Sequence, residues 1–548
     1  MLATWSLAAL LLAGPQGAAP DRKASIDGLF SAWDRTDSPG CSLGVFRDGR
    51  IDYSRGYGMA TLELGVANSP QTVFDIGSLG KQFTAFSILL LARDGKLSLD
   101  DDIRKFVPEI PDYGKRVTIR HLLHHTGGLR DYIGLLMLEG LSTEDVTTEQ
   151  DALDALARQK APLFAPGARY EYSNSGYFLL SLVVKRVSGR SLRDFAQERI
   201  FGPLRMTHTQ YNEDHTRVIP DRAAGYEFRD AGGFVIDMSP WEQNGDGGVL
   251  TSVEDLFLWD RNFFDPIVGD RALIEQMETV GILADGKRID YALGLVIGDY
   301  RGLRTVGHTG SWAGYRALLY RLPDQKLSVC ILCNVPVDRT PLMRKIAETY
   351  IGDRMTQAAR ASEPAPARIS VAPAELQRLA GPYRDPQTGE VWVLSAGDGA
   401  LVADTGTQKT VLDPIAPDLF APRRGSTLRL RIHPGVGGSR PSFVADWSGE
   451  EPQTFEPVAP WSPTPAEVGA FAGVYVSDEV GGTLRFVDAG GSLRLKHRVY
   501  SDGPWTPAGR DAFAAHGMAV TFTRSGGRVT GLLLDSGGMK GIAYRRVG

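Results

Sequence analysis

The sequence predicts an α+β domain followed by two smaller antiparallel β domains. Strand-like segments lie at both ends of a helix-rich stretch, which indicates a sheet assembled from distant parts of the chain. Residues 356–372 are rich in Ala, Pro and Ser and are typical of a linker. Beyond them, short alternating runs separated by Gly and Asp turns are typical of antiparallel sandwiches or barrels.

The first domain is expected over residues 21–355. An amphipathic helix over 21–40 ends at a Pro-Gly turn, and two strands follow over 41–46 and 51–54. The segment 78–94 is apolar nearly all round, so this helix is expected to be central and buried. Three consecutive strands and a closing helix are predicted near the end of the domain, over 303–306, 317–322, 328–333 and 341–350.

Two related β domains, over 373–460 and 461–548, are predicted from a weak internal repeat. The Pro-Ala-Glu at 373–375 recurs at 465–467, and the Ala-Gly-x-Tyr at 380–383 recurs at 472–475. Chance similarity between Gly-rich β segments is the alternative. The order and the approximate spacing of the repeated segments favour two copies of one β unit.

The overall charge argues against a nucleic-acid partner. The 548 residues include 60 Lys and Arg against 65 Asp and Glu, a formal net charge of −5, whereas nucleic-acid binders usually carry a basic surface. Hydrophobic residues make up 43% and charged residues 23%, which is ordinary for a soluble globular protein.

The N-terminal residues 1–19 resemble a signal peptide. A short apolar run over 7–13 is followed by small residues, and it is too short to span a bilayer. We therefore expect a periplasmic or secreted protein without a membrane span. The alternative is a short disordered tail on a cytoplasmic protein, because no Lys or Arg precedes the apolar run.

The cysteines and clustered histidines do not predict a metal or redox site. Three cysteines are too few for a disulfide framework, and the C-x-x-C of Cys330 and Cys333 lies in an apolar run that predicts a buried strand. Residues three apart in a strand face opposite sides, so we expect two packed cysteines there. His121 and His125 have the spacing of two metal ligands, but no third ligand is marked. We expect no metal and no other cofactor.

An S-x-x-K motif, Ser78 to Lys81, is the first candidate for chemistry. Ser78 begins the buried helix after a Gly, so its hydroxyl meets the positive end of the helix dipole. Lys81 lies one turn further on the same face. A neighbouring amine can activate a hydroxyl if the amine is neutral or shares a proton with a second base. Alone, the motif equally describes an N-cap Ser followed by a solvated Lys.

Two further motifs follow in order, Tyr-x-Asn at 172–174 and His-Thr-Gly at 308–310. With S-x-x-K, they resemble the three active-site motifs of the penicillin-recognising serine hydrolases, the class C β-lactamase and D-Ala-D-Ala carboxypeptidase type. The resemblance covers roughly residues 25–350. It implies a β-lactamase/transpeptidase-like catalytic domain, with an antiparallel sheet flanked by helices and a helical subdomain. The two C-terminal β-barrel domains resemble the layout of bacterial D-aminopeptidases.

By this resemblance the protein is a serine hydrolase that forms an acyl-enzyme. The implied catalytic residues are Ser78, Lys81, Tyr172 and His308, and the implied substrate-binding residues are Asn174, Thr309, Gly310 and Ser311.

The resemblance also implies a role for each of these groups. Ser78 attacks the substrate, and Tyr172, its pKa lowered by Lys81, takes the proton. Asn174 orients Lys81, and His308 shuttles protons or orients Tyr172. The backbone N–H groups of Ser78 and Ser311 form the oxyanion hole.

One departure from the family pattern bears on substrate choice. His308 stands where β-lactamases and carboxypeptidases usually have Lys, and a neutral His is a poorer anchor for a substrate carboxylate. This favours a D-aminopeptidase-like enzyme acting on small peptides or amides. A carboxylesterase, a β-lactamase or D-Ala-D-Ala carboxypeptidase, and a penicillin-binding sensor with slow turnover remain alternatives, and a homodimer remains open. The loops at 502–505 and 537–540 are candidates for reaching the cleft from the last domain.

Overall fold

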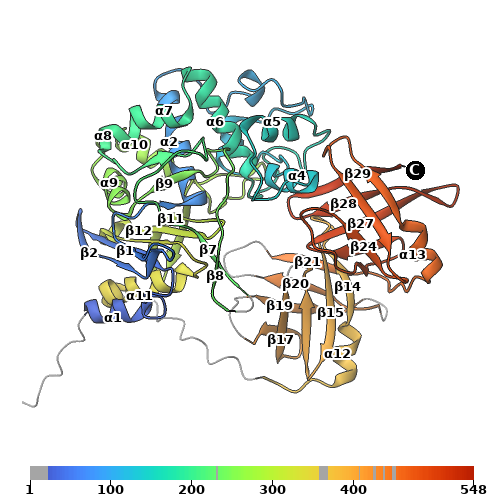
Figure 1. The fold of residues 1–548 in the computed structure, drawn as a ribbon. Coiled ribbons are helices and arrows are strands. Elements are labelled where there is room, and N and C mark those ends of the chain that lie inside the picture. Colours follow the sequence, from blue (N-terminus) through green and yellow to red (C-terminus); the bar gives the residue numbers. More distant parts are fainter. Residues whose placement is uncertain are drawn as a thin grey trace, which may run out of the picture.

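The computed structural model describes residues 22–229, 232–356, 368–406, 408–423, 428–435, 439–446 and 452–547. It confirms the predicted fold class, an α+β domain followed by two eight-stranded β units (Figure 1, orange and red). The expected signal peptide and most of the expected linker lie outside these residues. In the described part of the chain, no helix is both long and apolar enough to cross a membrane.

The α+β domain is built on a six-stranded antiparallel sheet that joins the two ends of the domain. Its strand order is β10-β11-β12-β13-β1-β2. The hairpin of the first two strands therefore joins strands from the end of the domain through the pair of β1 and β13, as the sequence predicts. The strands are β1 Cys41–Arg47, β2 Arg50–Tyr57, β10 Val296–Tyr300, β11 Leu303–Trp312, β12 Tyr315–Leu322 and β13 Leu327–Cys333.

Helices cover both faces of this sheet. On one face α1 (Arg22–Phe30) and α11 (Arg339–Ile351) bury apolar side chains against it. On the other face lie α2 (Lys81–Arg93), α9 (Val253–Phe264) and a helical subdomain (Figure 1). The subdomain contains α3 Ile119–Leu123, α4 Tyr132–Glu139, α5 Glu149–Ala157, α6 Asn174–Ser188, α7 Leu192–Ala196, α8 Gly202–Leu204 and α10 Arg271–Met277.

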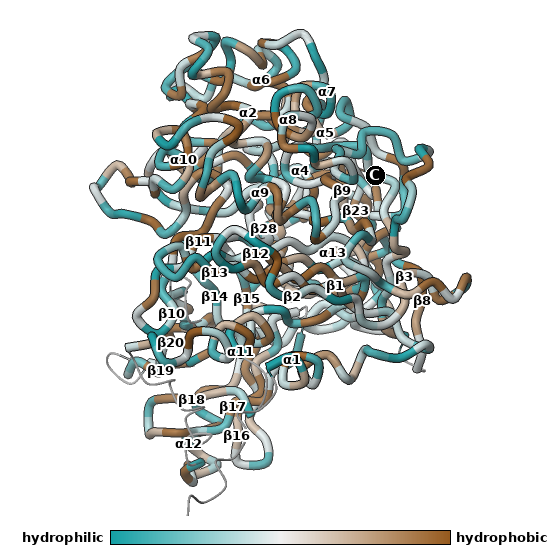
Figure 2. The backbone as a smooth tube through the Cα atoms, turned by 90° about the vertical axis from the view of Figure 1, so that its left-hand side faces the viewer, coloured by the Kyte–Doolittle hydropathy of each residue, from teal (hydrophilic) through white to brown (hydrophobic). Residues whose placement is uncertain are grey.

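The central helix α2 is buried along most of its length, as its apolar sequence predicts. Its residues from Lys81 to Leu91 are all buried. Hydrophobic segments run through α2 and the sheet strands, whereas the outlying loops are mostly hydrophilic (Figure 2). The single predicted helix over 78–94 is divided in the structure, because a tighter 3-10 turn, η1 (Gly77–Gly80), precedes α2.

The cysteine interpretation was wrong in one respect. Cys333 does not pack as a free thiol but forms a disulfide with Cys41, while Cys330 is free and buried. The two bonded residues lie directly opposite each other in the antiparallel pair of β1 and β13. Residues 292 positions apart in sequence become neighbours only through this pairing, so the C-x-x-C spacing misdirected the prediction. Disulfides of this kind persist in oxidising compartments, and export of the chain stays a prediction.

The two C-terminal units share one plan, which supports the predicted repeat. Each begins with a seven-residue helix that has Pro at its first position, α12 (Pro373–Leu379) and α13 (Pro465–Phe471). In each, the Tyr of the following strand donates its hydroxyl to the last helical carbonyl, at 3.0 Å for Tyr383 and 2.7 Å for Tyr475. Both rings are buried in their β core.

The first unit is a closed barrel and the second is nearly closed. In the first, β14 pairs with β21 to complete the circle, whereas in the second a single bridge, Arg494 to Pro504, joins the two edges. The first barrel consists of β14 Gly381–Arg384, β15 Val391–Gly397, β16 Ala400–Asp404, β17 Lys409–Ala416, β18 Leu419–Pro422, β19 Arg429–His433, β20 Ser442–Asp446 and β21 Gln453–Pro457. The second consists of β22 Gly473–Val476, β23 Thr483–Asp488, β24 Leu493–Lys496, β25 Thr506–Pro507, β26 Ala512–Ala515, β27 Met518–Ser525, β28 Arg528–Ser536 and β29 Met539–Val547.

The second barrel packs against α4 and α5 of the helical subdomain (Figure 1). Arg130, 5% exposed, lies 3.5 Å from the Glu479 carboxylate of the barrel and donates to the Lys540 carbonyl at 2.9 Å. Met539 packs against Gly134, where a Cβ would lie 2.7 Å from its methyl group. Of the two candidate loops, 537–540 therefore reaches the catalytic domain. The described residues of the 502–505 loop form hydrogen bonds within their own barrel.

We predict that Glu479→Ala destabilises the protein by about 3–5 kcal/mol, because it leaves the buried Arg130 charge without its carboxylate. The matched control is Arg498→Ala at the same interface. The Arg498 side chain forms an ion pair with Asp145 and is 62% exposed. An exposed pair of this kind contributes about 1 kcal/mol or less. Equilibrium urea unfolding compares the two variants, and equal losses would contradict the prediction.

Candidate active site

Ser78 is held at the junction of a small sheet and the central helix. The short strand β5 (Phe74–Asp75) pairs with β9 (Val249–Thr251), which brings residues 75–78 beside 246–249. The Asp75 carboxylate accepts the Gly77 N–H at 2.8 Å and so fixes the turn before Ser78. Lys81 begins α2 one turn later, as the S-x-x-K spacing predicts.

The Lys81 amine makes three short polar contacts inside the protein. Its Nζ lies 3.0 Å from Ser78 Oγ, 2.9 Å from Asn174 Oδ1 and 2.6 Å from the Asp246 carbonyl oxygen. The side chain is fully buried. A neutral amine has two hydrogens and one lone pair. Two of the three neighbours are carbonyl oxygens that can only accept, so a neutral Lys81 directs its lone pair at Ser78.

Burial increases the fraction of Lys81 that is a neutral amine near physiological pH. It lowers the pKa of Lys81 to about 8, against the opposing attraction of the Asp246 and Asp131 carboxylates. Burial also raises the pKa of Asp246 to about 6, while Lys81 and the hydrogen bond from Tyr132 oppose the rise. At pH 7 Asp246 is therefore mainly ionised, and a minor fraction of Lys81 is the neutral amine.

Tyr172 differs from expectation in its acidity. Its hydroxyl is hydrogen-bonded to Ser78, and the Lys81 amine lies 4.9 Å from its ring centre. The residue is 37% exposed toward the cavity, but its hydroxyl is enclosed beside Ser78, and this desolvation raises the pKa of Tyr172 above its ordinary value. The Asp246 and Asp131 carboxylates add to the rise. The expectation that Lys81 lowers this pKa is therefore wrong, because desolvation of the hydroxyl dominates and the two carboxylates add to it.

The Tyr-x-Asn motif is fixed by a residue that the sequence analysis missed. Asp131 accepts hydrogen bonds from the Asn174 backbone N–H at 2.7 Å and from its side-chain amide at 3.1 Å. The amide group is thereby oriented with Oδ1 toward Lys81. Ser175 reinforces the arrangement, because its hydroxyl bonds to the backbone on either side of Asp131.

The His-Thr-Gly motif lies on β11, directly against the Ser78 turn. A Cβ at Gly310 would lie 1.8 Å from the Ile76 carbonyl oxygen, and one at Gly77 would lie 2.9 Å from the Ser311 backbone nitrogen. β10 pairs with β11 only as far as Gly307, so the following residues of β11 pair with β12 on one side and have no partner among the described strands on the other. The strand edge at Ser311 thus adjoins Ser78, as an oxyanion hole built from these two residues requires.

His308 is buried beside the site and is not a cation. Its Nδ1 is hydrogen-bonded to the Thr309 carbonyl, and its Nε2 lies 3.1 Å from the Tyr291 hydroxyl. Burial lowers the pKa of His308 to about 4, so the ring is neutral at pH 7. Its ring centre is 6.2 Å from that of Tyr172. His308 therefore does not provide the positive charge that a Lys at this position would provide.

A cavity of about 200 Å³ opens above Ser78 and Tyr172. Two carboxylates line it, those of Asp75 and Asp246, and its described wall contains no Lys or Arg. Its apolar end is formed by Ile133 and the paired rings of Trp241 and Trp312, whose centres are 5.5 Å apart. Asn174 and Ser311 also line the cavity, whereas His308, Thr309 and Gly310 are not among its described lining residues.

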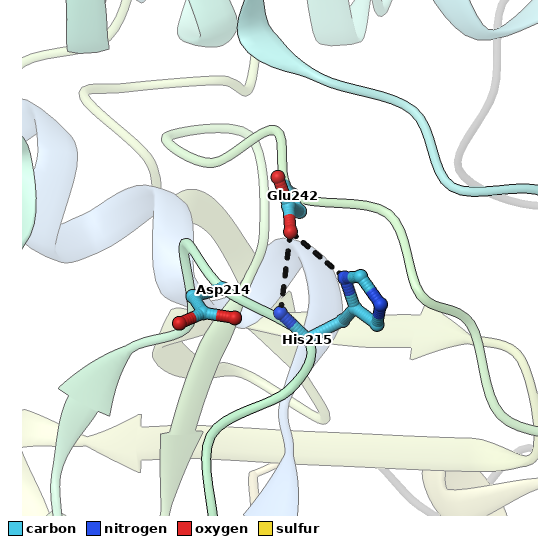
Figure 3. A group of neighbouring side chains, drawn as sticks. All are labelled: Asp214, His215 and Glu242. Carbon is cyan, nitrogen blue, oxygen red and sulfur yellow. Dashed lines mark hydrogen bonds and ion pairs between the residues drawn. The ribbon is translucent and has the colours of Figure 1, made fainter.

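A larger cavity, of about 570 Å³, lies elsewhere and is lined by Asp214 and Glu242. With His215, these two residues form the one His-and-carboxylate group of metal-site dimensions found in the described chain. Figure 3 shows Asp214, His215 and Glu242. His215 Nδ1 and its backbone nitrogen both contact Glu242, at 2.8 and 3.5 Å, and Asp214 caps the Thr216 backbone and hydroxyl. All three side chains are partly exposed and already bonded, so we assign no ion to them.

The comparisons with known proteins agree with this fold and layout. The sequence pattern named Beta-lactamase matches residues 27–350, more than half of the chain, so the protein belongs to the beta-lactamase family. The D-aminopeptidase of Brucella canis is 27% identical over 547 residues, covering 93% of this chain and 96% of that protein. The D-aminopeptidase of Brucella anthropi is 27% identical over 533 residues, covering 93% and 95%.

Solved structures show the same fold. A penicillin-binding protein homologue from Pyrococcus abyssi, described as octameric, has a TM-score of 0.57 and 24% identity over 80% of this chain and all of its own. A D-amino acid amidase from Ochrobactrum anthropi SV3 has a TM-score of 0.51 and 23% identity over 60% of this chain and 96% of its own. The predicted resemblance is confirmed, and the protein is a hydrolase of this family.

We predict that Gly310→Ala lowers the rate of covalent labelling by a fluorophosphonate by about 10² or more, because the methyl group must push β11 away from the Ser78 turn. The control is Gly298→Ala in β10 of the same sheet, where the added methyl meets only the Thr305 hydroxyl, at 3.0 Å. Circular dichroism establishes that both variants are folded. Normal labelling of Gly310→Ala would contradict the prediction.

Proposed function

We propose that the protein is a serine hydrolase that acylates at Ser78 and acts on small amides or peptides with a free amino group, as a D-aminopeptidase does. The observation that carries this proposal is the contact of the buried Lys81 amine with Ser78 Oγ at 3.0 Å, while two carbonyl oxygens occupy its other directions. This arrangement leaves the lone pair of the neutral amine for the serine proton.

In the proposed reaction, Ser78 Oγ attacks the substrate carbonyl carbon, and its proton moves to Lys81. The backbone N–H groups of Ser78 and Ser311 stabilise the negative oxygen that forms, an effect worth about 2.7–4 kcal/mol for each donor. The carbon–nitrogen bond then breaks, and the leaving amine takes a proton from the Tyr172 hydroxyl. The proton on Lys81 restores the phenol. Water hydrolyses the ester on Ser78 by the reverse sequence of proton transfers.

This scheme gives Lys81 the role of base and Tyr172 the role of acid in the acylation step. A phenol whose pKa is raised remains protonated at pH 7 and is a poor base but an available donor. Burial has the opposite effect on the ammonium and brings its pKa to about 8. The environment thus separates the two groups into a base and an acid.

The cavity supports an amine-bearing substrate over a carboxylate-bearing one. Its described wall offers the carboxylates of Asp75 and Asp246 and no Lys or Arg, and His308 is neutral. The two carboxylates attract a substrate ammonium, while the Arg339 guanidinium, 3.5 Å from Ser311 Oγ, provides a cation at one edge of the cavity. The Trp241 and Trp312 rings can receive an apolar or aromatic side chain. The D-aminopeptidase relatives support the same class of substrate.

We predict that the native protein hydrolyses a D-aminoacyl nitroanilide faster than it hydrolyses a chromogenic cephalosporin. A short-chain nitrophenyl ester is the third substrate, because an esterase would favour it. Ser78→Ala is expected to abolish turnover. Ser87→Ala is the matched control, since that serine lies within α2 and its hydroxyl donates to the Phe83 carbonyl one turn earlier. A preference for the cephalosporin would overturn the proposed substrate class, and full activity of Ser78→Ala would overturn the acyl-enzyme.

A further inference from the structure

His125 is the buried titratable group nearest to Tyr172 that the proposed reaction does not use. It is 3% exposed, and its ring centre lies 4.2 Å from that of Tyr172 at an interplanar angle of 32°. The rings of Tyr291 and Tyr177 lie 4.5 and 5.1 Å away on its other sides. His125 thus occupies the space behind the phenol of the active site.

The backbone segment that carries Tyr172 is bonded to His125 at two points. The Glu171 N–H donates to the His125 carbonyl oxygen at 3.0 Å, and the Ser173 N–H donates to the His125 Nδ1 at 3.2 Å. These bonds lie immediately before and immediately after Tyr172. One residue therefore fixes the chain on both sides of the phenol and also contacts its ring.

The backbone conformation of His125 limits which residues can replace it. Its φ is +56°, in the left-handed region that Gly adopts freely and that Asn, Asp and His adopt more often than other residues. Gly would fit this conformation but would supply neither the Nδ1 acceptor nor the ring.

His125 is not equipped to transfer a proton itself. Because Nδ1 accepts the Ser173 N–H, the ring proton is on Nε2, and Nε2 has no hydrogen-bond partner among the described side and main chains. Burial and the nearby Lys81 charge hold the pKa of His125 well below its usual range. A protonated ring would break the Ser173 bond. The group is therefore fixed as a neutral acceptor.

We infer that His125 is a positioning residue for Tyr172, which sets the phenol against Ser78 by bonding the backbone on both sides of it and by stacking on its ring. This inference deepens the proposed function and rests on the proposed role of Tyr172. It moves to His125 the orienting role that the family resemblance suggested for His308, whose hydrogen bonds go to Tyr291 and Thr309 instead.

The test compares two substitutions that separate the two contacts. His125→Phe keeps a ring but removes the acceptor, and we expect it to lower kcat by about 10–100-fold with little change in KM, since misplacing a catalytic group by about 1 Å can cost 10²-fold. His125→Asn keeps an acceptor near the Nδ1 position and tolerates the left-handed backbone. It should recover most of the lost kcat. His121→Gln, on the short helix α3 that precedes His125, is the control, because Gln preserves the capping of Thr118.

A double-mutant cycle distinguishes positioning from general stability. In a Tyr172→Phe background, either His125 substitution should have little further effect on kcat, because the group that His125 positions is gone. Equal fold-losses with and without Tyr172 would overturn the inference. If His125→Phe does not fold, His125→Gly takes its place in the cycle, because Gly fits the left-handed backbone and removes both the acceptor and the ring. Fluorophosphonate labelling of the native protein distinguishes failure of the proposed function from failure of this inference. If the native protein is not labelled, the acyl-enzyme at Ser78 is refuted. If it is labelled normally but the effects of the His125 and Tyr172 substitutions are additive, only the role of His125 is refuted.

Discussion

The site depends on the burial of one amine. Lys81 is the first residue of a helix that is enclosed between the sheet and the helical subdomain, and water does not reach it. A buried ammonium is destabilised by desolvation, and the Asp246 and Asp131 carboxylates offset only part of this cost. The other features of the site follow from this constraint. The carbonyl groups of Asn174 and Asp246 define where the amine hydrogens point, and Asp131 fixes Asn174.

Much of the fold and the central site could be predicted from the sequence because the informative residues are local or ordered along the chain. The S-x-x-K spacing places Ser78 and Lys81 on one helical turn, and the structure brings Asn174 to the same amine. Residues that act through long-range packing could not be found in this way. Asp131 has no motif of its own, and His125 was considered only for its spacing to His121. The Cys41–Cys333 disulfide depends on a strand pairing that no local pattern reveals.

The second C-terminal barrel contacts residues next to the active site but does not line its cavity. No described residue that lines the cavity comes from either barrel. The second barrel instead packs on α4 and pairs with Arg130, the neighbour of Asp131 in the chain. A Cβ at Gly538 would lie 3.9 Å from that of Asp131 and 3.8 Å from the Glu171 carboxylate. The barrel therefore adjoins the residues before Tyr172 and around Asp131, a position from which it supports the geometry of the catalytic groups.

The most direct test of the account is the pH dependence of fluorophosphonate labelling of Ser78 in the free protein. If the neutral Lys81 amine is the base, the second-order rate rises with pH as the ammonium loses its proton, with a midpoint near 8, the pKa of Lys81, and then levels off. In Lys81→Arg this rise should be absent, because guanidinium stays protonated over the range. A rate that is independent of pH between about 6 and 9, or a rise that persists in Lys81→Arg, would contradict the account.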